Sequence, residues 1–317
     1  MRAVRSPLKR ESGVERLLQA GSTGHCSVVK IPGAFGESIN AILNKRGFKL
    51  GKTIGEGSYC KVRVAFRATE LGYTQRLACK VINKKRASRD FVTKFLPREV
   101  SIVKTIRHPN IVTVYNVFEL EDQVYMFMDF CERGDLLDHI RNKGSFTETR
   151  AKHFFRQIVN AVEYLHARDI AHRDLKCENV LLSSRDQVKI ADFGFSRWCR
   201  DLTTNKRILS DTFCGSAAYA APEILQGIKY NPKMYDVWSM GCILYIMLCA
   251  TMPFDDTNVK QMLKIQTMRK LTFPTKCILS GRARRLILHI LEPDVTRRAT
   301  INQIAGSQWL SAACTPN

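Results

Sequence analysis

No C-x-x-C pair occurs among the eleven cysteines of this 317-residue sequence, and no apolar stretch is long enough to cross a membrane. Closely paired cysteines are typical of zinc sites and disulfide frameworks, so we expect reduced, intracellular thiols, most of them buried as small hydrophobic residues. The longest apolar run, 237–250, falls short of the roughly 20 residues that span a bilayer. We expect it to form a helix buried on all sides. The first residues also lack the apolar core of a secretory signal.

Acidic residues are scarce, with 29 Asp and Glu against 50 Lys and Arg and a net charge of +21. Residues 1–47 contribute only +5 of this charge, so the excess is spread along the chain. A spread excess is most often solvated surface, although it favours acidic partners and leaves a nucleic-acid-binding protein as one alternative. No RNP, zinc or helix-turn-helix pattern is present, so we expect no specific recognition of nucleic acid.

The spacing of apolar residues predicts a mostly antiparallel sheet with one helix, followed by a helical part. Strands are expected at 48–56, 60–69, 75–82, 112–119 and 123–129, with the helix near 92–106. Later helices are expected at 149–167, 232–250, 257–268, 282–291 and 300–309, the last opened by the capping-box pattern Thr300-x-x-Gln303. Residues 1–47 are poorly periodic, and we expect a mobile extension with a short amphipathic piece near 14–18.

The strongest chemical signal is the run His172-Arg173-Asp174-Leu175-Lys176-Cys177-Glu178-Asn179, followed by Asp192-Phe193-Gly194. These residues suit the transfer of a phosphoryl group from a metal nucleotide to a hydroxyl. Asp174 can accept the hydroxyl proton, and Lys176 can neutralise the moving phosphoryl group. Asn179 and Asp192 supply the hard oxygen ligands that Mg²⁺ prefers. The first run alone is a moderate signal, and its spacing from the second makes it strong.

A glycine-bearing segment lies upstream, between apolar residues that favour strands. It reads Ile54-Gly55-Glu56-Gly57-Ser58-Tyr59-Cys60-Lys61-Val62. Gly55 and Gly57 would let the backbone close over phosphates, because no side chain blocks the approach. Cys60 replaces the third glycine of the usual pattern, and by itself the segment fits an ordinary hairpin turn equally well.

Lys80 interrupts an apolar strand, which is costly unless its charge is paired. Nucleotide phosphates and a helix carboxylate would pair it. Glu99, on the helix expected near 92–106, is favoured over Glu70 in a turn-rich stretch and Glu119 in a strand. The alternative for Glu99 is an ordinary surface glutamate.

The segment 192–223 carries several hydroxyl residues among basic ones and ends in Ala-Pro-Glu. A phosphate on Thr212 would bring negative charge and strong acceptors, with Arg173 as its natural partner, and would order the segment. The alternative is that Thr212 is simply a polar loop residue.

Together these motifs resemble those of eukaryotic protein kinases, and Lys176 in its run is similar to the serine/threonine branch. Finer features resemble the testis-specific serine/threonine kinases of the calmodulin-dependent kinase group. The matching stretches are 95–99, 172–179, 192–196, 212–223, 252–256 and 293–297. The resemblance implies an α+β, bilobal fold at 48–310, with a small antiparallel sheet and one helix up to about 130 and a larger, mainly helical lobe at 131–310. Residues 1–47 would be an extension and 311–317 a short tail.

The resemblance also implies roles for single residues, using ATP and Mg²⁺ as cofactors. Met128 resembles the gatekeeper, while Asp129, Phe130 and Cys131 resemble the hinge that bonds adenine. Asp135 would lie by the ribose and the peptide, and Ser216 would bridge Asp174 and Lys176. Glu223 and Arg298 would form a buried ion pair, and Asp236 would brace the catalytic loop. Glu178 and Asp135 would line the peptide groove, which suggests substrates with Lys or Arg upstream of the target.

The predicted function is therefore an ATP-dependent serine/threonine kinase that acts on protein substrates, with a pseudokinase scaffold as the alternative. The resemblance further implies a role in sperm formation, a cytoplasmic, nuclear or flagellar location, and an upstream activating kinase or chaperone as partner. We expect a monomer without a membrane span. No basic amphipathic helix of the calmodulin-binding kind is expected after the domain. Alkylation of Cys60 is expected to block ATP binding.

Overall fold

The computed structural model describes residues 26–31, 37–69, 72–120, 122–184, 186–201 and 203–311. The chain forms two compact units, each with its own core. Of the described residues, those up to 86 and 114–128 form the first unit, and those at 87–113 and from 129 onward form the second. The expected amphipathic piece near 14–18 and nearly all of the tail at 311–317 lie outside the described residues.

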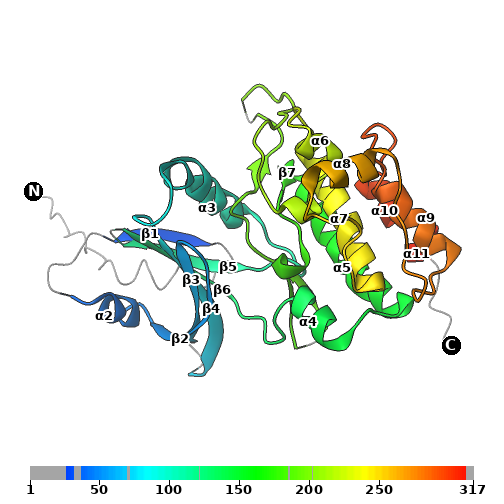
Figure 1. Cartoon of the computed structure of the whole chain (residues 1–317). Coiled ribbons are helices and arrows are strands. Elements are labelled where there is room, and N and C mark those ends of the chain that lie inside the picture. The colour runs from blue at the N-terminus through cyan, green and yellow to red at the C-terminus, as the bar shows by residue number, and fades with distance from the viewer. Residues whose placement is uncertain are drawn as a thin grey trace, which may run out of the picture. The chain divides into compact units, whose positions relative to one another are not determined.

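The first unit is a six-stranded sheet in the order β1-β5-β6-β4-β3-β2 (Figure 1). The strands are β1 Ser27–Ile31, β2 Phe48–Glu56, β3 Cys60–Ala68, β4 Thr74–Asn83, β5 Val114–Leu120 and β6 Gln123–Asp129. The five strands from β2 to β6 were predicted within two residues at either end. They pair antiparallel, and the longest ladder joins β3 to β4 from Cys60↔Ile82 to Ala68↔Thr74.

Two further elements of this unit come from the segment before Phe48. Strand β1 adds a parallel edge to β5, and helix α2 Ile39–Asn44 begins at Ser38, whose side chain accepts from the amide of Ala41. Ile42 and Leu43 of α2 are buried in the sheet's core. The sequence reading assigned no element here, because five or six residues are too few to show a period.

The second unit is mainly helical. Its helices are α3 Leu96–Thr105, α4 Leu136–Lys143, α5 Glu148–Ala167, α6 Pro222–Leu225, α7 Pro232–Cys249, α8 Val259–Thr267, α9 Gly281–Ile290, α10 Ile301–Ala305 and α11 Gln308–Ser311. Nearly every side chain of α7 is buried, which confirms the helix expected to be enclosed on all sides. The helix expected at 300–309 is divided in two, because α10 ends at Gly306, and its Thr300–Gln303 capping box is present.

The helix predicted near 92–106 begins as a π-helical turn, Phe91–Phe95, and continues as α3. The amide of Leu96 bonds back to the carbonyl of Phe91, five residues earlier. Pro97 follows at once and has no amide hydrogen to donate, so the wider turn ends where the α-helix starts. Glu99 therefore lies in the first turn of α3, where it is almost fully buried.

Within the described ranges, no helix combines the length and the hydropathy that crossing a bilayer requires. The sheet of the first unit and the helices of the second give the α+β architecture that the sequence predicted.

Candidate active site

A single buried carboxylate holds the backbone of the loop that carries Asp174. Asp236, on α7, accepts the amides of His172 at 2.9 Å and Arg173 at 2.7 Å, and also contacts Nε2 of His166 at 2.9 Å. The bracing role predicted for Asp236 is thereby confirmed. Arg173 adopts a φ of 65°, a strained value for a residue with a side chain, and Asp236 compensates by holding its amide.

The carboxylate of Asp174 has two unlike oxygens. Oδ2 accepts from Nδ2 of Asn179 at 3.0 Å and lies 3.1 Å from the Lys176 ammonium. Oδ1 is buried and has no hydrogen-bond partner in the part of the chain that the structure describes. Because leaving a buried acceptor unpaired costs free energy, Oδ1 is suited to a donor brought by a substrate, such as a hydroxyl.

A short hairpin brings Asn179 and Asp192 to one place. Strands β8 Val180–Leu182 and β9 Val188–Ile190 pair antiparallel with Val180 opposite Ile190, so the residues flanking that pair meet at the same end. The amide of Ala191 donates to the carbonyl of Asn179 at 2.9 Å. Asp192 follows directly, with a φ of 61°, and accepts from the amide of Gly194.

The residues around Asp192 pack against α3 and the catalytic loop. A Cβ added to Gly194 would stand 3.3 Å from Oδ1 of Asp192 and 3.7 Å from Oε2 of Glu99, so both carboxylates lie beside this glycine. Phe193 is buried edge-on against the ring of His172, at 4.9 Å between centroids. His172 itself contacts the carbonyl of Ala191 through Nε2 and accepts from the amide of Asp174 through Nδ1, which places its proton on Nε2.

In the first unit, the glycine-bearing segment forms the tight connection between β2 and β3. The amide of Gly57 donates to the carbonyl of Cys60 at 2.8 Å, and Glu56 pairs with Lys61 at 3.0 Å across the turn. A Cβ on Gly57 would lie 3.1 Å from Sγ of Cys60, so the cysteine side chain occupies the space beside this glycine. Next along the ladder, Val62 stands opposite Lys80.

Comparison with known proteins decides the family. The protein kinase domain family matches residues 48–310. The chain belongs to the protein kinase family. It is 47% identical over 275 residues to testis-specific serine/threonine-protein kinase 1 of Mus musculus, covering 85% of this chain and 73% of that protein. It is 45% identical over 271 residues to testis-specific serine/threonine-protein kinase 3 of Mus musculus, covering 85% of this chain and 98% of that kinase.

A more distant relative is CBL-interacting protein kinase 9 of Oryza sativa subsp. japonica, 39% identical over 262 residues, with 83% of this chain and 56% of that protein covered. The resemblance to the testis-specific serine/threonine kinases is therefore confirmed, and the chain is a protein serine/threonine kinase.

The buried ion pair expected between Glu223 and Arg298 is present in the helical unit of the kinase. Arg298 donates to both carboxylate oxygens of Glu223, at 2.7 and 2.8 Å, and the two side chains are almost fully buried. The guanidinium also lies over the ring of Trp238 and donates to the carbonyl of Met234. This fork geometry, with its extra partners, satisfies a charge that would be costly to bury alone.

The residues expected at the kinase hinge are partly engaged in structural bonds. The amide of Asp129 donates to the carbonyl of Thr113, and its carboxylate accepts from the amide of Thr113 and from Lys189. A bond from Asp129 to adenine would therefore come from its carbonyl oxygen. Burial raises the pKa of the Cys131 thiol to about 12, so this side chain stays protonated at neutral pH.

Two acidic residues, Asp135 and Glu178, are expected in the peptide groove. Asp135 caps α4 by accepting from the amide of Asp138 at 2.8 Å. Burial raises the pKa of Asp135, the amides of Asp138 and Leu137 oppose this shift, and the negative charges of Asp138 and then of Glu178 add to it. Glu178 accepts from the Tyr219 hydroxyl at 3.4 Å, a contact that the sequence reading missed because the two residues lie 41 positions apart.

Three arginines, Arg98, Arg173 and Arg197, lie close enough to affect one another's charge, and Arg173 contacts the segment that carries Thr212. Arg173 donates to the buried Ser210 hydroxyl and to the carbonyl of Phe195, while its Nη2 atom is buried with no partner in the described part of the chain. Burial, then the charges of Arg173 and Arg197, lower the pKa of Arg98. The sequence reading missed Arg98, although it directly precedes Glu99.

Three expected roles stay predictions. Lys80 and Glu99 belong to different units of the kinase, so their pairing is not tested. Gly215, with a φ of 86°, lies so close to the catalytic loop that a Cβ there would stand 2.6 Å from the carbonyl of Arg173. Ser216 is thereby held near Asp174, but its bridge to Lys176 is untested. Met128 is likewise placed only as the last residue of the first unit.

Proposed function

We propose that this serine/threonine kinase transfers the γ-phosphoryl group of Mg-ATP to Ser and Thr hydroxyls of proteins, with Asp174 accepting the hydroxyl proton. The observation that supports the proposal is that the two oxygens of the Asp174 carboxylate have different surroundings. Asn179 and Lys176 hold one oxygen, while the other, buried, has no partner among the described residues. A substrate hydroxyl bonded there would be oriented for attack, and positioning of this kind supplies a large part of the acceleration.

The side chains present fit a magnesium nucleotide. The structure's described residues contain no group of three or more His, Cys, Asp or Glu suited to a metal. Mg²⁺ is usually held by one or two protein ligands together with phosphate oxygens, and Asn179 and Asp192 would supply these ligands. The bound ion would neutralise charge on the phosphates. Lys80, oriented by Glu99, would hold the α- and β-phosphates, and the backbone of residues 54–62 would cover them.

The acidic pair at the peptide groove supports a preference for basic substrates. Burial and the charge of Glu178 both favour the protonated form of Asp135, so a Lys or Arg side chain would relieve repulsion there. Peptides with an upstream arginine should therefore have a lower KM than otherwise identical peptides with alanine. A peptide array showing no preference, or an acidic one, would remove this part of the proposal.

We further propose that phosphate on Thr212 activates the enzyme. Thr212 is exposed and can be reached by a kinase, whereas Ser210, two residues earlier, is fully buried. Repulsion within the cluster of Arg98, Arg173 and Arg197 would be relieved by an anion, and a phosphate on Thr212, two residues from Ser210, would supply one. The segment would then be ordered by charge-assisted bonds.

The test of catalysis is phosphate transfer from Mg-ATP to a basic Ser/Thr peptide and to the protein itself. Asp174→Asn should lower transfer by at least the roughly 10²–10⁴-fold that general-base catalysis contributes. Lys80→Met should lower transfer too, because the α- and β-phosphates would lose their cation, and both variants should unfold thermally near wild type. Transfer by either variant at the wild-type rate would overturn the assignment. If wild type binds Mg-ATP but transfers no phosphate even after treatment with an activating kinase, the result would favour the pseudokinase alternative.

The switch is tested separately with Thr212→Ala. Loss of transfer by this variant, with Thr203→Ala unaffected, would support the switch, because Thr203 is an exposed hydroxyl residue of the same segment. Equal transfer by wild type and Thr212→Ala would rule out the switch but would not affect the assignment as a kinase.

The names of the relatives support action in testis, and we propose a role in sperm formation with an upstream kinase or chaperone as partner. We also propose a monomer that works in the cytoplasm.

A further inference from the structure

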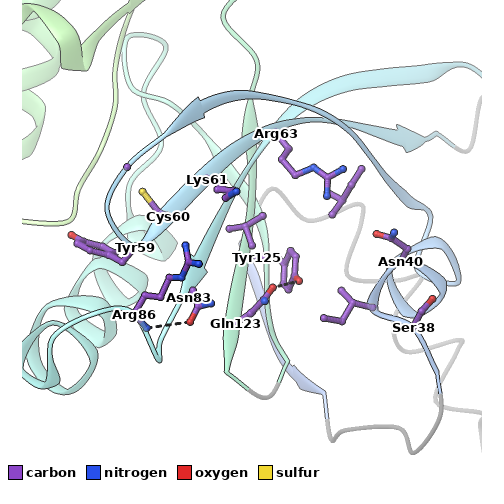
Figure 2. Close-up of a pocket in the computed structure, with 14 residues that line it drawn as sticks. Ser38, Asn40, Tyr59, Cys60, Lys61, Arg63, Asn83, Arg86, Gln123 and Tyr125 are labelled. Atoms are coloured by element: carbon purple, nitrogen blue, oxygen red, sulfur yellow. Dashed lines mark hydrogen bonds between the residues drawn. The ribbon is translucent and has the colours of Figure 1, made fainter.

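A cavity of about 460 Å³ lies on one face of the first unit's sheet, between helix α2 and the turn that joins β2 to β3 (Figure 2). Its walls come from α2, β2, β3, β4 and β6, so segments far apart in the sequence meet there. The cavity lies on the face of the sheet away from Lys80, although Gly57, Tyr59, Cys60 and Lys61 of its lining belong to the segment 54–62 that is predicted to cover the nucleotide. Side chains alternate between the faces of a strand, and the lining includes Val81 but not its neighbour Lys80, and Lys61 and Arg63 but not Val62.

The charge of the lining is of one sign. Lys61, Arg63 and Arg86 contribute three cations, and none of the lining residues is acidic. Lys61 does pair with Glu56, but both side chains are more than half exposed, and such pairs are weak. Arg63 is fixed in place, because its Nε and Nη2 atoms both donate to the carbonyl of Gly51, at 2.9 and 2.7 Å. A cation held in this way is organised before a ligand arrives.

The other residues that line the cavity are mostly apolar, with a few polar groups among them. Ile39, Leu50, Val81 and Tyr125 belong to the core cluster of the sheet or pack against it. Asn40 on α2, Asn83 on β4 and Gln123 on β6 add polar groups to the lining, and Gln123 accepts from the Tyr125 hydroxyl (Figure 2). Apolar walls with a few convergent polar groups, in a volume of roughly 300–1,000 Å³, are typical of small-molecule sites.

We propose that this cavity binds a small organic anion, in which a carboxylate, sulfonate or phosphate is joined to an aromatic or aliphatic body. The anionic group would lie against Lys61, Arg63 and Arg86, and the body against Leu50, Val81 and Tyr125. The chain's own first 25 residues are a poor occupant, since they carry five Lys and Arg but only two Glu. Their charge would be repelled by the same three cations that attract the ligand.

The site shares residues with the predicted nucleotide loop. Gly57, Tyr59 and Cys60 line the cavity, and the bond between the Gly57 amide and the Cys60 carbonyl closes that loop. A ligand that packs on them would favour some loop conformations over others, and coupling between two sites is reciprocal. This step rests on the proposed ATP binding, whereas the binding site itself does not.

The binding test uses the full chain and 8-anilinonaphthalene-1-sulfonate, a fluorescent probe with an aromatic body and one anionic group. We expect saturable binding that weakens at least tenfold in the double variant Lys61→Gln/Arg86→Gln. The matched control is Lys49→Gln/Lys52→Gln, which removes two exposed lysines of β2 that do not line the cavity. The neutral counterpart N-phenyl-1-naphthylamine should bind at least tenfold more weakly than the sulfonate.

A second variant separates charge from shape. Asn40→Trp, at an exposed position of α2, keeps every cation but fills the cavity's mouth, and it should also abolish binding. Equal probe affinity in wild type and in either cavity variant, with unfolding temperatures unchanged, would overturn the proposal. So would complete competitive displacement of the probe by Mg-ATP, which would place it in the nucleotide site.

The coupling is tested by measuring Mg-ATP affinity with and without saturating probe. We expect at least a threefold change, and the same factor for probe affinity with and without ATP. An unchanged ATP affinity would refute the coupling while leaving the site. Because probe fluorescence needs no phosphoryl transfer, failure of the proposed kinase mechanism cannot be mistaken for failure of this site.

Discussion

Asp236 shows how one side chain can hold a loop from which it is distant in the sequence. Its carboxylate satisfies two consecutive backbone amides, of His172 and Arg173, and contacts His166, all in a buried setting. We expect Asp236→Ala to lower the free energy of unfolding by about 1–3 kcal/mol for each buried amide left unpaired. Transfer activity should fall as well, because the backbone just before Asp174 would lose its anchor. Urea unfolding and a transfer assay measure the two effects.

A matched control for this prediction is Asp256→Ala, at an exposed position. Its free energy of unfolding should stay within about 0.5 kcal/mol of wild type. If Asp236→Ala proves as stable as this control, the Asp236 carboxylate does not stabilise the loop that contains Asp174.

Single residues could be predicted wherever the chemistry lies in a short run. Asp174, Asn179 and Asp192 were identified by their spacing, and the β8–β9 hairpin brings the last two together. Contacts between distant residues could not be read in this way. Nothing in the sequence shows that Tyr219 bonds to Glu178, or that Arg98 lies near Arg173, because both depend on how separate elements pack.

Helix α2 tests whether residues before Phe48 stabilise the first unit. Leu43 is fully buried among residues of several strands, so Leu43→Ala should cost about 2–5 kcal/mol of stability, as large-to-small changes in cores do. Asn44→Ala, at the exposed next position, is the control. Chemical unfolding gives the stability, and hydrogen exchange of the β5 amides should show where protection is lost. A cost within about 0.5 kcal/mol, as for ordinary surface changes, would mean that α2 does not stabilise the sheet.

Asp169 links Lys233 of α7 to Arg200 within the second unit, and these contacts predict a pH dependence. Hydrogen bonds from Lys233, at 2.6 Å, and from Arg200, at 3.0 Å, lower its pKa, while burial opposes them. A carboxyl group whose pKa is lower in the folded state adds stability above its unfolded pKa, and this is lost as the pH falls through the folded value.

Asp169→Asn should therefore be less stable than wild type at pH 5–7, with a gap that narrows below about pH 4. Thermal unfolding across this range measures the gap. Asp256→Asn, at an exposed carboxylate, is the control. A gap of constant size down to pH 2.5 would show that the Asp169 charge is not responsible.

At the scale of elements, length decided what the sequence could predict. The strands β2 to β6 and the helices α5, α7, α8 and α9 are long enough for their periods to be read, and each was expected close to its observed bounds. The short elements β1 and α2 were missed. The division of α10 from α11 was missed too, since apolar spacing alone does not show that the helix stops at Gly306.

At the scale of the whole molecule, the two units are not continuous in the sequence. Residues 87–113, with α3, group with the helical unit, and the chain then returns to the sheet for 114–128. Hydrophobic patterns report which face of a strand is buried but not which neighbour covers it. The type of the longer elements could therefore be predicted, whereas their grouping needed the fold.

The net charge of +21 also belongs to the whole molecule, because the excess cations are spread along the chain. We expect weak binding to double-stranded DNA with no preference between sequences. A protein that neutralises about two phosphates loses roughly tenfold in affinity between 50 and 200 mM salt, so the dissociation constant should rise at least that much. Fluorescence anisotropy with two unrelated duplexes measures both expectations. A DNA affinity that does not change with salt concentration but differs between the two duplexes would contradict both expectations and would favour a surface that recognises sequence. Salt-sensitive binding of equal strength to both would assign the excess charge to non-specific attraction of acidic partners.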